Sequence, residues 1–130
     1  MKILSLAGSL RSESANKKLA REAIRLLGAA WLANAEYADL RDYPMPIYDG
    51  DQERADGIPD AVQRLAAKIV GADALIVATP EYNGGISSVL KNTIDWLSHR
   101  PEAGVASGAF GTAACPSKRS ACTCSPGAAR

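Results

Sequence analysis

Short apolar runs alternate with helix-periodic segments through residues 1–98 of the chain. Residues 2–7 read KILSLA and are closed by Gly8, which predicts a buried strand. A helix is predicted next, because four apolar residues recur there at helical spacing. They are Leu19, Ala23, Leu26 and Leu27. Residues 36–40 predict a weaker second strand, nearer the edge of a sheet.

Residues 41–57 carry two prolines, two glycines and four aspartates, a composition typical of a loop. A loop of this length in a compact domain often lines a site or an interface. Pro59 and Asp60 then suit the first turn of a helix. The predicted apolar face of that helix consists of Ile58, Val62, Leu65, Ile69 and Val70.

Residues 72–78 read ADALIVA, and their consecutive apolar side chains indicate a strand covered on both faces. A last helix is predicted from about Ser87. Its inner stripe consists of Val89, Leu90, Thr93, Ile94 and Leu97. This alternation of strands and helices predicts a parallel α/β sheet with right-handed crossovers. Ligands bind such sheets beyond the carboxyl ends of the strands, so the loops after the first and third strands are the candidate site.

The first of these loops is rich in groups that bind phosphate. Gly8 permits a tight turn, and the following helix offers unpaired N–H groups with a partial positive charge. Arg11 adds a charged fork that matches phosphate oxygens. Short polar side chains are contributed by Ser9, Ser12, Ser14 and Asn16. A polar helix cap would use the same residues, but their density with an arginine favours phosphate. The loop matches neither a Walker A nor a GxGxxG motif.

The second loop reads TPEYNGG over residues 79–85. Pro80 stiffens it, and Gly84 and Gly85 let the main chain approach a flat ligand closely. Tyr82 is placed to pack near an aromatic ring. Taken alone, the segment is equally compatible with a simple turn rich in turn-forming residues.

Overall composition narrows the class of protein. The chain is 47% hydrophobic and 22% charged, with a net charge of +1, so no strong field gathers nucleic acid or acidic lipid. No apolar run approaches the roughly 20 residues of a membrane helix, and the N-terminal strand is too short for a signal peptide. We therefore expect a cytoplasmic protein that binds neither nucleic acid nor membrane.

The three cysteines, Cys115, Cys122 and Cys124, lie close to the C-terminus. Their spacing fits neither a disulfide framework nor paired zinc knuckles, although a zinc site that includes His99 is conceivable. We interpret them as incidental cysteines and predict no metal site.

Together the two loops and the segments around them resemble the NADPH-dependent FMN reductase family, of the chromate and quinone reductase kind. The first loop, GSLR with Ser14 and Asn16, resembles that family's flavin-phosphate motif. The segment PEYN at residues 80–83, followed by LKN and IDW at residues 90–92 and 94–96, resembles its flavin-ring loop and helix. Residues 40–49 also fit. Ser87 departs from the family, in which proline is common, but serine can cap the start of that helix.

The resemblance implies a flavodoxin-like domain that binds FMN and forms a homodimer or homotetramer. It places Ser9, Arg11, Ser14 and Asn16 at the FMN phosphate. It places Pro80, Glu81, Tyr82, Asn83 and Gly84 at the flavin ring. NADPH or NADH would deliver hydride to FMN, and a quinone, azo compound, chromate or free flavin would accept the electrons. No catalytic acid or base is implied, because the cofactor supplies the chemistry.

Residues 99–130 lack leucine, isoleucine, tryptophan and tyrosine. We therefore divide the chain into a flavodoxin-like part at residues 1–98, with three of the five family strands, and a tail at residues 99–130. Low hydrophobicity predicts a disordered tail. A shifted reading frame after about residue 98 is the interpretation we favour, because the motif likeness ends there abruptly.

Three functional classes follow from these patterns. The first is a flavin reductase homologue that is truncated in this chain. The second is a flavodoxin-like electron carrier, which Arg11 and the near-neutral charge disfavour. The third is an inactive fragment that binds no flavin. Because an unpaired third strand would leave an apolar sheet edge, we expect marginal stability and weakened FMN binding.

Overall fold

A three-stranded parallel sheet forms the centre of the molecule. The computed structural model describes residues 1–31 and 34–99, and the predicted tail, with its cysteines, lies outside these residues apart from His99. The strands are β1 (Lys2–Ala7), β2 (Asn34–Asp39) and β3 (Ala74–Ala78), in the order β2-β1-β3. This is the 2-1-3 order expected of a flavodoxin-like sheet, and all pairings are parallel.

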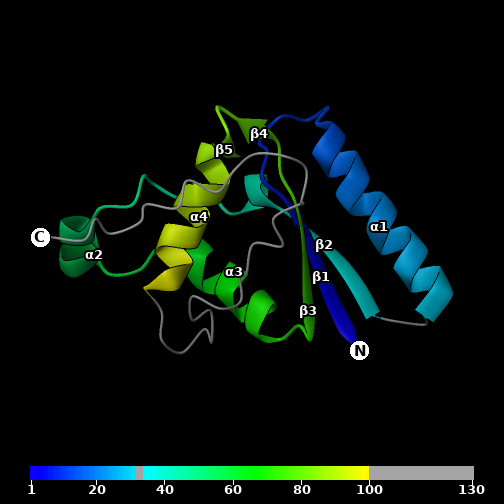
Figure 1. The fold of residues 1–130 in the computed structure, drawn as a ribbon. Helices are drawn as coiled ribbons and strands as arrows, with labels where there is room; N and C mark the ends of the chain where they lie inside the picture. Colours follow the sequence, from blue (N-terminus) through cyan, green and yellow to red (C-terminus); the bar gives the residue numbers. More distant parts are fainter. Residues whose placement is uncertain (32–33, 100–130) are drawn as a thin grey trace, which may run out of the picture.

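Helices cover both faces of this sheet, as predicted. Helix α1 (Ala15–Trp31) lies against one face, whereas α3 (Asp60–Val70) and α4 (Ser88–Ser98) lie against the other (Figure 1). All of β1 except Lys2 is buried, because this central strand has a neighbour on each side and helices above and below. No helix within the described ranges is long and apolar enough to cross a membrane.

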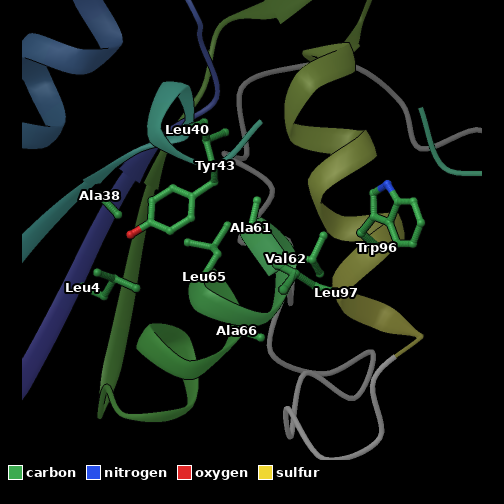
Figure 2. Packing of buried hydrophobic residues seen from close by; sticks show 10 residues of the cluster. All are labelled: Leu4, Ala38, Leu40, Tyr43, Ala61, Val62, Leu65, Ala66, Trp96 and Leu97. Atoms are coloured by element: carbon green, nitrogen blue, oxygen red, sulfur yellow. The ribbon is translucent and has the colours of Figure 1, made fainter. Parts of the chain in front are cut away.

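The main hydrophobic core lies between the sheet, α3 and α4 (Figure 2). The cluster includes Leu4 of β1, Val62 and Leu65 of α3, and Trp96 and Leu97 of α4. Val62 and Leu65 belong to the apolar face predicted for α3, whereas Val70 at the end of that helix is exposed. Trp96 is fully buried, although its position was not included in the predicted stripe.

The face predicted for α1 is wrong in part. Leu19 and Leu26 remain 62% and 53% exposed, whereas Ala20 is buried. The helix packs closely on the sheet through Ala20, which joins Ala7 of β1 and Ala78 of β3 in a second small core. Small side chains decide the orientation here, so the spacing of the larger leucines was a poor guide to the buried face.

Residues 41–57 are not one continuous loop. The 3-10 helix η1 (Leu40–Asp42) follows β2, and a short helix α2 (Gly50–Asp56) lies further along. Asp49 caps α2 by accepting a hydrogen bond from the Asp51 N–H, and Gly57 ends it with a positive φ of 78°. Helix α2 has no buried residue, and that explains why apolar periodicity did not reveal it.

Candidate functional site

The two predicted loops meet at the carboxyl edge of the sheet. Loop 1 (residues 8–14) leaves β1 and loop 2 (residues 79–87) leaves β3. The N–H of Gly8 donates to the carbonyl of Ala78 at 2.8 Å. A Cβ atom on Gly8 would lie only 2.6 Å from Thr79 Oγ1 and 3.0 Å from Leu90 Cβ. Only glycine therefore allows the start of loop 1 to approach loop 2 this closely.

Hydrogen bonds within loop 1 and to the end of β1 hold loop 1 in its conformation. The Ser9 N–H donates to the Ala7 carbonyl at 2.8 Å, and the Arg11 N–H donates to Ser9 Oγ at 3.3 Å. Ser9 and Ser14 are buried, and Asn16 is half-buried in the first turn of α1. Ser14 directly precedes α1, so the unpaired N–H groups that begin a helix lie beside it.

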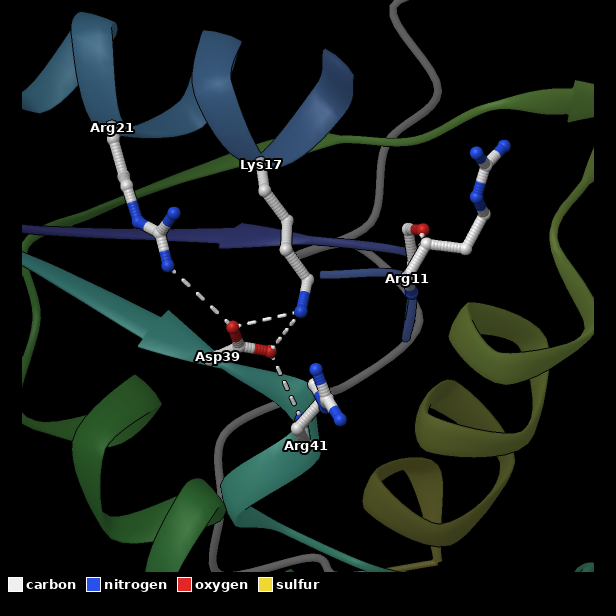
Figure 3. A network of polar contacts seen from close by, with 6 residues as sticks. Arg11, Lys17, Arg21, Asp39 and Arg41 are labelled. Carbon is white, nitrogen blue, oxygen red and sulfur yellow. Dashed lines mark hydrogen bonds and ion pairs between the residues drawn. The ribbon is translucent and has the colours of Figure 1, made fainter. Parts of the chain in front are cut away.

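The side chain of Arg11 is exposed at the surface of loop 1. It points away from the ion pairs below the loop (Figure 3). Within residues 1–31 and 34–99, its guanidinium forms no salt bridge. Arg11 therefore offers a positive charge that no protein carboxylate neutralises in the described part of the chain.

Loop 2 is a small β-hairpin. Strands β4 (Glu81–Tyr82) and β5 (Gly85–Ile86) pair antiparallel, and Asn83 and Gly84 form the turn with φ values of 52° and 78°. Two successive positive φ angles are typical of a type I′ turn, for which Asn-Gly is the preferred sequence. Pro80 is half-buried at its base, while the turn and both strands are exposed, Tyr82 by 57%. The hairpin therefore projects from the sheet edge with its residues, including Tyr82, exposed.

A buried ion pair supports the β2 side of loop 1. Lys17 of α1, with only 1% of its side chain exposed, donates to both carboxylate oxygens of Asp39 at 2.7 and 2.8 Å (Figure 3). Asp39 also accepts from the Arg41 N–H, and Arg21 lies 3.7 Å from it. Burial acts to raise the pKa of Asp39, but the Lys17 hydrogen bonds, the Arg41 amide and the nearby positive charges outweigh it. The pKa of Asp39 is therefore lowered.

Helix α4 holds the segment that follows η1. Asn92 donates to the Pro46 carbonyl and accepts from the Tyr48 N–H, both at 2.8 Å, and Trp96 Nε1 donates to the same carbonyl at 2.9 Å. The Tyr48 ring also packs edge-on against Trp96 at 5.1 Å between centroids. An apolar cavity of about 190 Å³ lies between loop 1, the segment that follows β2 and α4. Its lining consists of Leu10, Leu40, Tyr43, Pro44, Met45, Val89 and Thr93.

The structure thus gathers the predicted residues of both loops at one sheet edge. Sequence reasoning did not identify Lys17 and Asp39 as part of this edge. The signal available was weak, because Asp39 is simply the last residue of β2 and Lys17 lies on a helix rich in basic residues. Asn92 and Trp96 were identified only as part of a motif, without their contacts.

Comparison with known proteins adds an independent finding. A sequence model of the family described as NADPH-dependent FMN reductase matches residues 1–124. The match extends beyond residue 98, where the motif likeness was expected to end. An NAD(P)H-dependent FMN reductase of Pseudomonas aeruginosa is 42% identical over 123 residues, covering 87% of this chain and 64% of the relative. A quinone reductase of Escherichia coli is 38% identical over 104 residues, covering 78% of this chain and 53% of the relative.

Solved structures agree with this result. The flavoenzyme NAD(P)H:(acceptor) oxidoreductase FerB of Paracoccus denitrificans superposes with a TM-score of 0.62 at 32% identity. The superposition covers 80% of this chain and 54% of FerB. The chain therefore spans between about half and two thirds of the length of these three proteins.

Proposed function

Because this chain belongs to the NADPH-dependent FMN reductase family, we propose that it binds FMN at loops 1 and 2 and takes part in NAD(P)H-dependent flavin reduction. The phosphate would lie at Ser9, Arg11, Ser14 and Asn16. The ring would lie at Pro80, Glu81, Tyr82, Asn83 and Gly84. A small-molecule acceptor, a quinone foremost, would take up the electrons, in keeping with the names of the relatives.

One observation carries the proposal: the hydrogen bond from Gly8 to Ala78 brings a phosphate-type loop and an exposed hairpin to one edge of the sheet. FMN has a charged phosphate at one end and a flat ring at the other. A site for FMN therefore needs a polar, positively charged part beside an exposed stretch of main chain. Loop 1 would supply the first part and loop 2 the second.

The residues present fit the two ends of FMN. At the phosphate end, Arg11 is exposed and without a carboxylate partner among the described residues, and the first N–H groups of α1 follow Ser14. Arginine and helix N-terminal amides are strong phosphate ligands. At the ring end, Tyr82 and the Asn83–Gly84 turn are exposed rather than packed into the protein.

Bound FMN would supply the redox chemistry, accepting hydride from NADPH or NADH and passing electrons to the acceptor. The chain itself would bind the phosphate through Arg11, orient the ring against the hairpin, and keep Gly8 free of any side chain. No catalytic acid or base is proposed. We also propose a homodimer or homotetramer in the cytoplasm, as the family resemblance implies.

A titration with FMN, followed by quenching of flavin fluorescence, tests the proposal directly. We expect saturation at one FMN per chain, and weaker binding of riboflavin, which lacks the phosphate. Arg11→Ala should weaken the binding of FMN by about tenfold, because a charge-assisted hydrogen bond is lost, and should leave the binding of riboflavin unchanged. Arg54→Ala is the matched control, because Arg54 lies on α2 and pairs with Asp51.

The alternatives give different results in the same experiment. Saturable FMN binding without any NADPH oxidation would favour an electron carrier of the flavodoxin kind. No flavin binding by the soluble, folded chain would contradict the proposal and favour an inactive fragment.

A further inference from the structure

Ser87 joins three parts of the site through one buried hydroxyl. It lies between the β4–β5 hairpin and α4, and the residue is only 4% exposed. Its Oγ donates to the carbonyl of Gly8 at 2.6 Å, across 79 positions of sequence. The same oxygen accepts from the Leu90 N–H at 3.3 Å and lies 3.4 Å from Thr79 Oγ1.

These contacts divide into a local and a long-range part. The bond from the Leu90 N–H caps α4, which is the ordinary role of serine at the start of a helix. The bond to Gly8 has no such local purpose, because Gly8 belongs to loop 1. A serine whose only function was capping would not need to reach the main chain of another loop.

The bond acts at the residue that sets the direction of loop 1. The Gly8 N–H is already fixed by Ala78, so the Ser87 hydroxyl fixes the carbonyl of the same residue. With both polar groups of Gly8 held, the peptide planes that follow have a defined orientation. Ser9 and Arg11 are then held in the arrangement in which the Arg11 N–H donates to Ser9 Oγ.

We propose that Ser87 is a positioning residue that ties the phosphate-binding loop to the ring-binding hairpin. The two halves of the site are then ordered together. This inference rests on the proposed FMN site, but it assigns Ser87 a role toward the phosphate end, although Ser87 adjoins the hairpin and lies outside the phosphate motif. It predicts that loss of the hydroxyl affects FMN more than riboflavin.

Two substitutions break the bond from Ser87 to Gly8, and the amide exchange described below separates this loss from the loss of the helix cap. Ser87→Ala removes the hydroxyl, and Ser87→Pro removes it while keeping a backbone suited to a helix start, because Ser87 has a φ of −61°. Ser88→Ala is the matched control, since Ser88 is exposed and begins the same helix. We expect both Ser87 variants to raise the Kd for FMN by about five- to tenfold, as for one lost hydrogen bond. The Kd for riboflavin should stay within about twofold, and Ser88→Ala should match the parent chain.

A second measurement decides the inference without any flavin. Amide hydrogen exchange of the cofactor-free chain reports on the bonded N–H groups of Gly8, Ser9 and Arg11. We expect faster exchange at these three amides in both Ser87 variants and unchanged exchange in β2. If only Leu90 in α4 exchanges faster, Ser87 is a cap alone and the inference is wrong. If the parent chain binds no FMN, the proposed function fails while the exchange result still decides the role of Ser87.

Discussion

The ammonium of Lys17 bridges both carboxylate oxygens of Asp39 beneath loop 1, although Lys17 is almost completely buried. The pair joins α1 to the end of β2. A buried charge that loses its partner is costly, whereas an intact pair contributes little net stability relative to apolar residues. Removing one partner of the pair should therefore cost more free energy of unfolding than the intact pair contributes.

Lys17→Met should lower the free energy of unfolding by about 3 kcal/mol, because Asp39 is left with only partial solvent access. Urea denaturation measures this loss. Lys18→Met is the matched control, since the neighbouring Lys18 pairs with Glu13 at the surface and should cost less than about 1 kcal/mol. Equal losses in the two variants would contradict a buried, energetically coupled pair.

The same pair predicts a pH dependence of stability. The pKa of Asp39 is lowered in the folded protein, so its contribution is present above the ordinary value of 3.8 and is lost as the pH falls through the folded value. Protonated Asp39 is neutral and has the shape of asparagine. The difference in unfolding free energy between the parent chain and Asp39→Asn should therefore be largest near neutral pH and should shrink as the pH falls below 3.8 and through the lowered pKa of folded Asp39. A difference that stays constant from pH 7 to pH 2 would be evidence against the lowered pKa.

Two glycines offer a paired test of the contact between the loops. Gly8→Ala should destabilise the fold and abolish FMN binding, because the added methyl would overlap Thr79 Oγ1 and crowd Ser87 Oγ and Leu90 Cβ. Gly28→Ala should instead stabilise the fold by about 1 kcal/mol, because Gly28 is inside α1 and its Cβ position is open. Thermal unfolding with and without FMN measures both effects. An unchanged melting temperature in Gly8→Ala would show that loop 1 does not require this close approach.

The sheet and the meeting of the two candidate loops at its edge could be predicted from the sequence, for identifiable reasons. β1 and β3 are short apolar runs closed by turn residues, and parallel strands place their carboxyl ends at one edge. Both candidate loops follow from that rule alone.

Other features depended on tertiary contacts that local patterns do not carry. The buried face of α1 is set by Ala20 and Lys17, not by the larger Leu19 and Leu26. The Lys17–Asp39 pair depends on where α1 crosses the end of β2. The hairpin of loop 2 could have been predicted from the sequence, because Asn83 and Gly84 form the preferred type I′ turn sequence.

Gly84 offers a test of the proposed ring end of the site that is separate from the phosphate end. Gly84 has a φ of 78°, a conformation that costs a residue with a Cβ about 1 kcal/mol. The neighbouring Gly85 has no positive φ, and its Cβ position is open except for the Tyr82 carbonyl at 3.8 Å. Gly84→Ala should therefore distort the turn, whereas Gly85→Ala is the matched control.

Because the hairpin is exposed, Gly84→Ala should change the global melting temperature little. It should weaken the binding of FMN and the binding of riboflavin equally, by about fivefold. Parallel titrations of the two flavins measure this. Equal losses would follow because the isoalloxazine ring is common to both molecules, and the phosphate is not. A loss confined to FMN would instead place the hairpin at the phosphate, contrary to the proposed orientation of the cofactor.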